Sequence, residues 1–298
     1  MRTLTLGFDG TPESEAAGEW AAREAVRSEA RLRVVYAWEW QPYSLTLMDA
    51  GTERRWVESL PRTEAATLAS HHPDLDVVGE RVSGPPVSVL LPVADDSETL
   101  VLGSRALGGL HGFVIGSVAQ SVVAHATLPV VLVRAPEAGS DADPNGAEET
   151  GEVLVGVDLE HPDDDLLAPA FTAAERRGVR LHVLHCGRLP RGARGAPTGS
   201  AERSGAGTEP TAEEHAEEDA RLTAALEPWR RDHPEVEVVA ETCAGRPAER
   251  LVHASENASL LVVGRRSHRH TPWGPRIGHV THAAMHHARS PVLVVPRA

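Results

Sequence analysis

The chain has 298 residues, of which 41% are hydrophobic and 24% charged, a balance typical of a soluble globular protein with two domains of ordinary size. Its formal net charge of −14 argues against a protein that coats nucleic acid or an anionic membrane. No apolar run approaches the ~20 residues of a membrane helix, and the first one is too short for a signal peptide. We therefore expect a cytoplasmic protein with no membrane partner.

The first half alternates short Val/Leu-rich runs with longer stretches of helical periodicity. We expect strands near residues 4–8, 33–38, 76–82, 99–103 and 130–134. We expect helices over residues 12–29, 52–71, 86–95 and 117–126, the first with a proline near its start. Strands that alternate with helices predict an α/β fold, in which helices cover both faces of a parallel sheet.

The second half repeats the first. Five segments recur in the same order: Thr5–Asp9 with Leu154–Asp158, Leu32–Tyr36 with Leu181–His185, Gly84–Pro86 with Gly245–Pro247, Leu100–Arg105 with Leu261–Arg266, and Pro129–Val133 with Pro291–Val295. The second copy therefore has expected strands near residues 153–158, 180–186, 235–240, 259–263 and 292–295. The chain is predicted to be two tandem copies of one domain.

Two stretches lack apolar periodicity and mark the connections. Residues 137–151 are acidic and lie between the copies, so we expect an interdomain linker there. Residues 188–211 are rich in Gly, Pro, Ser, Arg and Thr and predict a disordered loop. The expected domains are residues 1–136, called domain 1 below, and residues 152–298, called domain 2.

A glycine-rich loop follows the fourth expected strand. It begins at Gly103 and ends at Gly116, where Ser117 is expected to cap an apolar helix. Free backbone N–H groups and the helix dipole at such a helix start favour an anion. The loop is not a Walker loop, since no GK[ST] follows, and not the GxGxxG of dinucleotide enzymes, which belongs to the first strand–helix turn. That first turn also lacks the SGGxDS pattern of ATP pyrophosphatases.

At these residues the chain resembles the nucleotide-binding subgroup of the universal stress protein family, whose signature is G-x2-G-x9-G-[S/T]. Gly103, Gly116 and Ser117 reproduce the spacing, while Ala106 stands where the family has its second glycine. The turn Phe8–Thr11 resembles the family's VDGS, and His125–Val133 resembles its ending, HAxCPVxVV. The resemblance implies two copies of a five-stranded Rossmann-like parallel sheet, related to adenine nucleotide alpha hydrolases, with strand order 3-2-1-4-5.

The resemblance also implies a site for an adenine nucleotide such as ATP, with or without Mg²⁺, in domain 1. Asp9 and Ala37 would frame the adenosine. The phosphates would be held, mostly by backbone N–H groups, by Gly103, Arg105, Gly116, Ser117 and Val118. Two alternatives stay open: Asp9 as a helix-capping or turn carboxylate, and Arg105 in a surface salt bridge. The added methyl group at Ala106 would either crowd the phosphates or, if φ there is negative, be tolerated.

The second copy carries a different loop. It has one more residue, fewer glycines and two prolines, and His279 replaces the serine of the first copy. We therefore expect poor phosphate binding in domain 2. Arg265, Arg266, Arg269 and Arg276 make the loop basic, so binding of another anion stays open beside a simple solvated surface.

The cysteines and histidines give weak signals. Cys186 and Cys243 lie in different segments without metal-ligand spacing, so we expect neither a disulfide framework nor a zinc site. His282 and His286 are spaced to share one helix face, but no HExxH or nearby carboxylate completes a metal site. His125 and His287 occupy equivalent positions and are expected to share a structural role.

No catalytic constellation is found, so we do not expect an enzyme, although slow ATP hydrolysis stays open. The favoured function is a nucleotide-responsive stress or signalling protein with an unidentified protein partner, and the alternative is an interaction scaffold with vestigial pockets. The apolar last strands, Val130–Val133 and Val292–Val295, are expected at sheet edges. We predict that they face each other in an internal pseudo-dimer, with further homo-oligomers possible.

Overall fold

The computed structural model describes residues 2–39, 50–106, 113–135, 151–160, 164–187, 212–266 and 277–297. The expected linker at 137–151, apart from Gly151, and the expected loop at 188–211 lie outside these residues. The described elements of domain 1 are β1 (Thr3–Phe8), α1 (Pro12–Arg27), β2 (Arg31–Trp38), α2 (Ala50–His71), β3 (Val77–Ser83), α3 (Pro86–Ala94), β4 (Thr99–Ala106), β5 (Phe113–Val114), α4 (Ser117–His125) and β6 (Val130–Arg134). Those of domain 2 are β7 (Glu152–Val157), α6 (Asp164–Arg177), β8 (Leu181–Gly187), α7 (Ala212–Asp232), β9 (Val238–Ala244), α8 (Pro247–Ala254), the 3₁₀ turn η2 (Ser255–Asn257), β10 (Ala258–Arg266), α9 (His279–His287) and β11 (Val292–Arg297).

Each domain builds a parallel sheet of the predicted order. Domain 1 runs β3-β2-β1-β4-β6 and domain 2 runs β9-β8-β7-β10-β11, so the α/β fold and the order 3-2-1-4-5 are confirmed. The order reverses between β1 and β4 and again between β7 and β10, where a ligand site is expected beyond the carboxyl ends of the strands. The short strand β5 pairs antiparallel with the end of β4.

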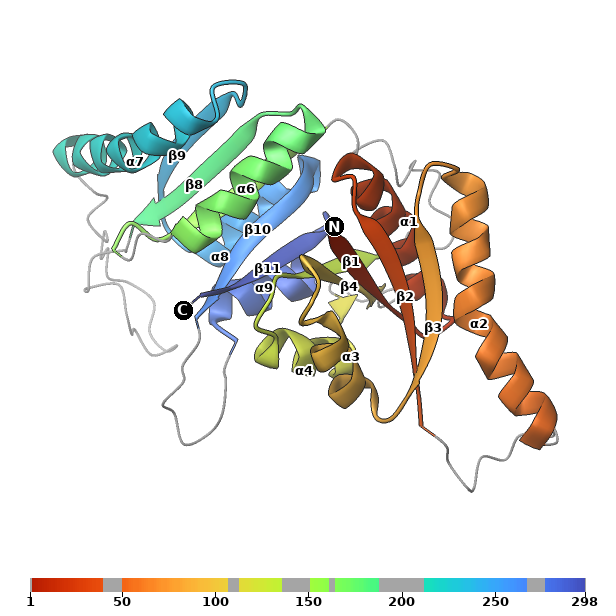
Figure 1. Ribbon diagram of the computed structural model, residues 1–298. Helices are drawn as coiled ribbons and strands as arrows, with labels where there is room; N and C mark the ends of the chain where they lie inside the picture. Colours follow the sequence, from red (N-terminus) through yellow and green to blue (C-terminus); the bar gives the residue numbers. More distant parts are fainter. Residues whose placement is uncertain are drawn as a thin grey trace, which may run out of the picture.

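The two sheets join into one. β6 pairs with β11 in antiparallel register, with Val131 opposite Leu293 and Leu132 opposite Val292. The pairing of these two last strands is thereby confirmed, and Figure 1 shows the two halves of the molecule on either side of this seam. Because both edges are apolar and find partners here, neither is left as an exposed template for another chain.

Two layers of side chains cover the continuous sheet. One core cluster packs α1, α2, α6 and α7 against one face, with Trp20, Leu68, Phe171 and Leu222 among its members. The other packs α3, α4, α8 and α9 against the opposite face, with Leu90, Val122, Leu251 and Met285 among its members. Both clusters contain residues of both domains, so burial of apolar surface holds the halves together as well as each half internally.

Polar contacts reinforce the seam in both directions. Arg134 of β6 donates from Nη2 to the carbonyl oxygens of Met285 (2.7 Å) and Ala284 (3.3 Å) in the last turn of α9. Arg265 of β10 donates from Nη2 to the carbonyl oxygen of Ala126 (2.6 Å), the residue that ends α4. Each domain thus places a cation at the negative end of the other domain's last helix, where the dipole favours it. Burial lowers the pKa of Arg134 to about 9.

Three expectations are corrected by the structure. β4 continues to Ala106 instead of ending at residue 103, because β6 and then β5 supply hydrogen-bonding partners for it. β9 spans Val238–Ala244, not 235–240, because a turn in which Val236 N–H bonds the His233 carbonyl ends α7 first. Helix α4 begins at Ser117 with Gly116 as its N-cap, so the serine is the first helical residue, not the cap.

Candidate functional site

The turn after β1 gives Asp9 a structural role. Its Oδ1 accepts hydrogen bonds from the N–H (3.1 Å) and hydroxyl (2.6 Å) of Thr11, the N-cap of α1. Thr11 Oγ1 in turn accepts from Ser14 N–H (3.3 Å). Gly10 has φ +77°, a conformation that only glycine adopts easily, and it turns the chain between Asp9 and the helix. Asp9 is exposed while it organises this turn, so the structure shows it as a turn carboxylate that holds the N-cap residue Thr11.

The ends of β2 and β3 form an apolar shelf. Ala37 lies opposite Val82 in the register of the two strands, and both are half-buried against the core cluster of α3 and α4. Tyr36 points to the other face of the sheet, where burial, and then the charge of Asp9, raise the pKa of its phenol. The shelf therefore lies on the face of the sheet that α3 and α4 cover, whereas Tyr36 lies on the face that α1 covers.

Gly103 is needed for packing inside domain 1. It lies within β4, and a Cβ atom built on it would stand 2.4 Å from the carbonyl oxygen of Glu13 and 2.8 Å from the N of Ser14. The first turn of α1 thus rests directly on β4. The absence of a side chain at Gly103 lets α1 approach β4 closely. This packing alone explains why a glycine stands there, without a role in phosphate binding.

The end of β4 accommodates the alanine that departs from the family signature. Arg105 pairs with Val114 and Ala106 with Phe113 in the antiparallel register of β4 and β5. Among the described residues other than glycine, Glu29 alone has a positive φ, so Ala106 takes an ordinary extended conformation. The backbone conformation at this position therefore does not require glycine. The tip of the predicted loop, residues 107–112, and the Arg105 side chain lie outside the described residues.

The start of α4 is an open helix N-terminus. Gly116 (φ −59°, ψ 151°) caps the helix without a side-chain hydrogen bond, and a Cβ built on it would meet nothing within 4 Å. Ser117 is exposed and Val118 half-buried. The first N–H groups of α4 have no partners inside the helix, and an anion is a natural partner for such groups.

Parallel topology brings most of the predicted site residues to one edge of the sheet. β1, β2 and β4 are neighbours and run in the same direction, so Asp9, Ala37 and Gly103 lie at their carboxyl ends. Helix α4 follows β5 closely, which places Gly116, Ser117 and Val118 after the same edge. The structure also places β5 against α9, so a helix of domain 2 flanks the loop region of domain 1.

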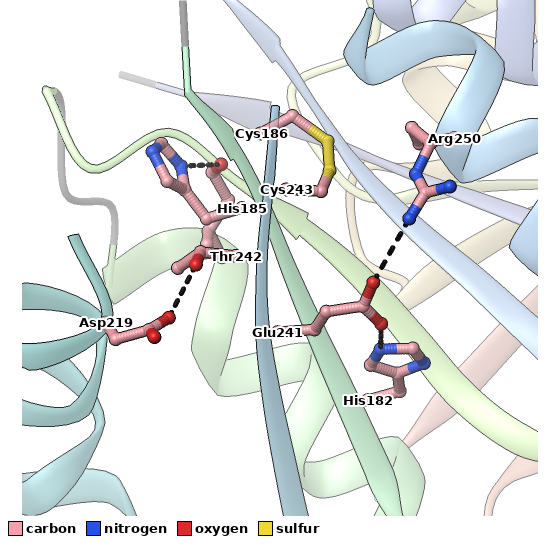
Figure 2. The surroundings of a disulfide bond; sticks show 9 residues. His182, His185, Cys186, Asp219, Glu241, Thr242, Cys243 and Arg250 are labelled. Atoms are coloured by element: carbon pink, nitrogen blue, oxygen red, sulfur yellow. Dashed lines mark hydrogen bonds and ion pairs between the residues drawn. A yellow bond between two sulfur atoms is a disulfide. The ribbon is translucent and has the colours of Figure 1, made fainter. Parts of the chain in front are cut away.

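Domain 2 fills the equivalent positions differently. Cys186 stands where domain 1 has Ala37, Cys243 stands where it has Val82, and the two cysteines form a disulfide (Figure 2). The expectation of no disulfide was wrong. The signal was available in the repeat, because aligning the copies places both cysteines at neighbouring strand positions, although they are 57 residues apart in the chain.

One arginine of the predicted basic loop of domain 2 lies at the seam between the domains. Arg265 is 4% exposed and bonds Ala126 of domain 1, so it serves the seam rather than a surface anion site. A Cβ on Gly264 would meet the Cδ of Arg297 at 2.6 Å, where Gly103 of domain 1 meets the backbone of α1. The pKa of the Arg297 guanidinium is lowered by burial, and the nearby charge of Asp158 offsets only part of this effect. The Arg269 and Arg276 positions lie outside the described residues.

The histidine pair on α9 lies as the spacing predicted. The rings of His282 and His286 stack with centroids 4.2 Å apart. Burial, followed by the charges of His286 and His287, lowers the pKa of His282. In the part of the chain that the structure describes, no group of three or more His, Cys, Asp or Glu side chains is placed to hold a metal ion.

None of the described helices has the length and apolar character needed to cross a membrane.

Comparisons with known proteins agree with this architecture. The model of the universal stress protein family matches twice, at residues 1–134 and 150–296. The universal stress protein Rv2005c of Mycobacterium tuberculosis is 30% identical over 306 residues, covering 98% of this chain and 96% of that protein, and a universal stress protein of Mycolicibacterium smegmatis is 30% identical over 308 residues, covering 98% and 96%. The crystal structure of a universal stress protein from Archaeoglobus fulgidus matches with a TM-score of 0.73 at 18% identity, covering 99% of this chain and 98% of that one. The chain belongs to the universal stress protein family, in a form that carries two of its domains in tandem.

Proposed function

We propose that domain 1 binds an adenine nucleotide at the carboxyl edge of its sheet and that the protein responds to this nucleotide in a stress or signalling role. The observation that carries the proposal is the open N-terminus of α4, which follows the same sheet edge as the apolar shelf of Ala37 and Val82. An apolar shelf suits the flat face of a base, and free N–H groups suit phosphate. Both halves of a nucleotide therefore find suitable partners on one face of the sheet.

The individual roles follow from the chemistry of each residue. The base packs against Ala37, and the Asp9 carboxylate accepts a hydrogen bond from a ribose hydroxyl while it keeps its bonds to Thr11. The phosphates accept from the N–H groups of Ser117 and Val118, from the Ser117 hydroxyl and from Arg105. Backbone donors let a protein with a net charge of −14 bind an anion without a large basic surface.

Gly116→Val tests the site without disturbing the core. Its Cβ would meet open space and its φ of −59° suits an ordinary residue, so the fold should tolerate the substitution, whereas a phosphate at the helix start would collide with the added methyl groups. We expect isothermal titration of the full chain with ATP and Mg²⁺ to give binding, and Gly116→Val, alone or with Ser117→Ala, to abolish it.

Domain 2 supplies a matched control for this experiment. Gly278 caps α9 with nearly the same geometry (φ −63°, ψ 156°) and is equally open. Gly278→Val should leave ATP affinity unchanged. No heat at millimolar ATP from the unmodified chain would instead favour the interaction scaffold, and phosphate release over hours would show slow hydrolysis.

A further inference from the structure

The only two cysteines of the chain meet at one point of the fold. Cys186 on β8 and Cys243 on β9 are register partners with Cα atoms 4.6 Å apart, and their sulfur atoms are bonded. Figure 2 shows the bond bridging the two neighbouring strands. The disulfide therefore links strands that the sheet already holds side by side.

The position of this pair is set by the repeat. In domain 1 the next-to-last residues of β2 and β3 are the register partners Ala37 and Val82. In domain 2 the next-to-last residues of β8 and β9 are Cys186 and Cys243. The disulfide thus occupies the counterpart of the apolar shelf, at the carboxyl edge of the sheet.

The fold itself does not need the link. β2 and β3 pair over seven register positions, from Leu32 opposite Val77 to Trp38 opposite Ser83, without a cross-link. β8 and β9 pair over seven positions in the same parallel manner. Neighbouring strands lie ~4.8 Å apart, which brings paired Cβ atoms within reach of a disulfide. The same backbone can therefore hold either two thiols or one disulfide.

One member of the pair is partly exposed. Cys186 is half-buried, whereas Cys243, at 7% exposure, is buried in the core cluster of this face. Glu241 lies two residues before Cys243 on the same face of β9, and its side chain is 41% exposed. It binds His182 Nε2 (3.0 Å) and Arg250 (3.3 Å), as Figure 2 shows. The face that carries the disulfide thus borders polar, partly exposed side chains, and Cys186 is the more exposed of the two cysteines.

We propose that Cys186 and Cys243 form a redox-active pair, a thiol–disulfide exchange site whose reactants are low-molecular-weight thiols or dithiols. A thiolate attacks one sulfur of the disulfide, forms a mixed disulfide with that cysteine and releases the other as a thiolate. A second thiolate then displaces the first cysteine. Two reactant thiols are oxidised to one disulfide, the protein disulfide is reduced to two thiols, and the two protons of the reactants end on the cysteines.

Thiol trapping of the full chain tests the proposal. The protein is equilibrated in buffers of varied reduced to oxidised glutathione, treated with iodoacetamide and weighed by mass spectrometry, with circular dichroism recorded in parallel. We expect one transition from no added groups to two, with the spectrum of a folded protein on both sides. Labelling that requires denaturant would overturn the proposal, and so would two reactive thiols at every glutathione ratio.

Two variants complete the test. Cys186→Ala with Cys243→Val gives domain 2 the residues of domain 1, so it should fold and show no mass change at any ratio. Cys186→Ala alone should leave one thiol, labelled without a paired transition. If the double variant fails to fold, the spectrum of the reduced and alkylated natural chain decides: a folded spectrum supports a reversible pair, and an unfolded one shows a purely structural bond. None of these readouts involves a nucleotide, so they stand apart from the function proposed for domain 1.

Discussion

The next-to-last residues of β2 and β3 in domain 1 are the pair Ala37 and Val82, whereas those of β8 and β9 in domain 2 are the bonded pair Cys186 and Cys243. At the start of the last helix, Ser117 in domain 1 corresponds to His279 in domain 2, with a glycine N-cap before each. The backbone geometry is thus shared and the chemistry is not. The difference teaches that fold similarity between the halves carries no information about whether both halves bind the same ligand.

The largest predicted effect comes from moving the cysteine pair into domain 1, which gives both domains the same residues at these positions. Ala37→Cys with Val82→Cys places two thiols at register partners, and the oxidised form would fill the apolar shelf. We expect the Kd for ATP to rise ~100-fold on oxidation, because the base loses its contact surface, and to recover with dithiothreitol. Titration calorimetry measures both states. Ala37→Cys alone serves as the control, and equal loss in that variant would contradict the explanation.

A second prediction compares two ion pairs that join the domains. Arg177 is 2% exposed at its side chain and binds Glu24, 12% exposed, at 2.7 Å, whereas Arg176 and Glu98 are 19% and 38% exposed. Glu24→Ala removes the Glu24 carboxylate from beside a guanidinium whose side chain is buried, and it should lower the free energy of unfolding by ~2–3 kcal/mol. Glu98→Ala should cost under ~0.5 kcal/mol. Urea denaturation followed by circular dichroism measures both, and similar losses would contradict the role assigned to burial.

A third prediction uses the equivalent glycines of β4 and β10. Gly103→Ala drives a methyl group against the α1 backbone, which cannot move cheaply, so we expect a loss of ~1–3 kcal/mol. Gly264→Ala meets the flexible side chain of Arg297 and should cost under ~1 kcal/mol. The midpoints of thermal unfolding give the ranking, and the reverse order would show that α1 and Arg297 do not lie where the structure puts them.

The smallest predicted effect is a pH dependence that belongs to domain 1. Burial, then the charges of Glu15 and Glu19, raise the pKa of Glu64 from 4.5 to about 7. The unfolded chain releases this proton near pH 4.5, so the stability that the raised pKa contributes is present below that pH and is lost as the pH rises towards 7. Because Glu64 is only half-buried, solvent screens its charge, and we expect Glu64→Gln to stabilise the protein by only ~1 kcal/mol at pH 8.

The control for this prediction is pH itself. At pH 4, where Glu64 is protonated in both states, Glu64→Gln should have little effect on the free energy of unfolding measured in urea. A stabilisation of equal size at pH 4 and pH 8 would mean that packing, not the carboxylate charge, distinguishes the variant.

The sequence was sufficient for the elements whose formation depends on local pattern. The Val/Leu-rich runs predicted the existence of every strand of the two parallel sheets, although the bounds of β9 were wrong. The equal apolar character of residues 130–133 and 292–295 predicted that these edges pair. Hydrophobic periodicity and run length carry that information directly. The extension of β4 to Ala106 could not be predicted in this way, because it depends on hydrogen-bonding partners in β5 and β6.

The candidate site was predictable to a smaller extent. The sequence was enough to place Asp9 and Ala37 at one edge of the sheet, because the carboxyl ends of neighbouring parallel strands lie at the same edge. The contact of Gly103 with α1, the use of Arg265 at the seam and the disulfide all depend on which side chains meet across the fold. Of these, the disulfide alone left a trace in the sequence, in the alignment of Cys186 with Ala37 and of Cys243 with Val82.

The antiparallel pairing of β6 with β11 has one more consequence. In a symmetric dimer of identical chains, every substitution appears at both sites, so neither site can change without the other. Here a single chain contributes both partners of the pairing, and each half is encoded separately. One half can therefore keep the pair Ala37 and Val82 while the other carries a cysteine pair at the equivalent positions, and the two always occur together in a one-to-one ratio.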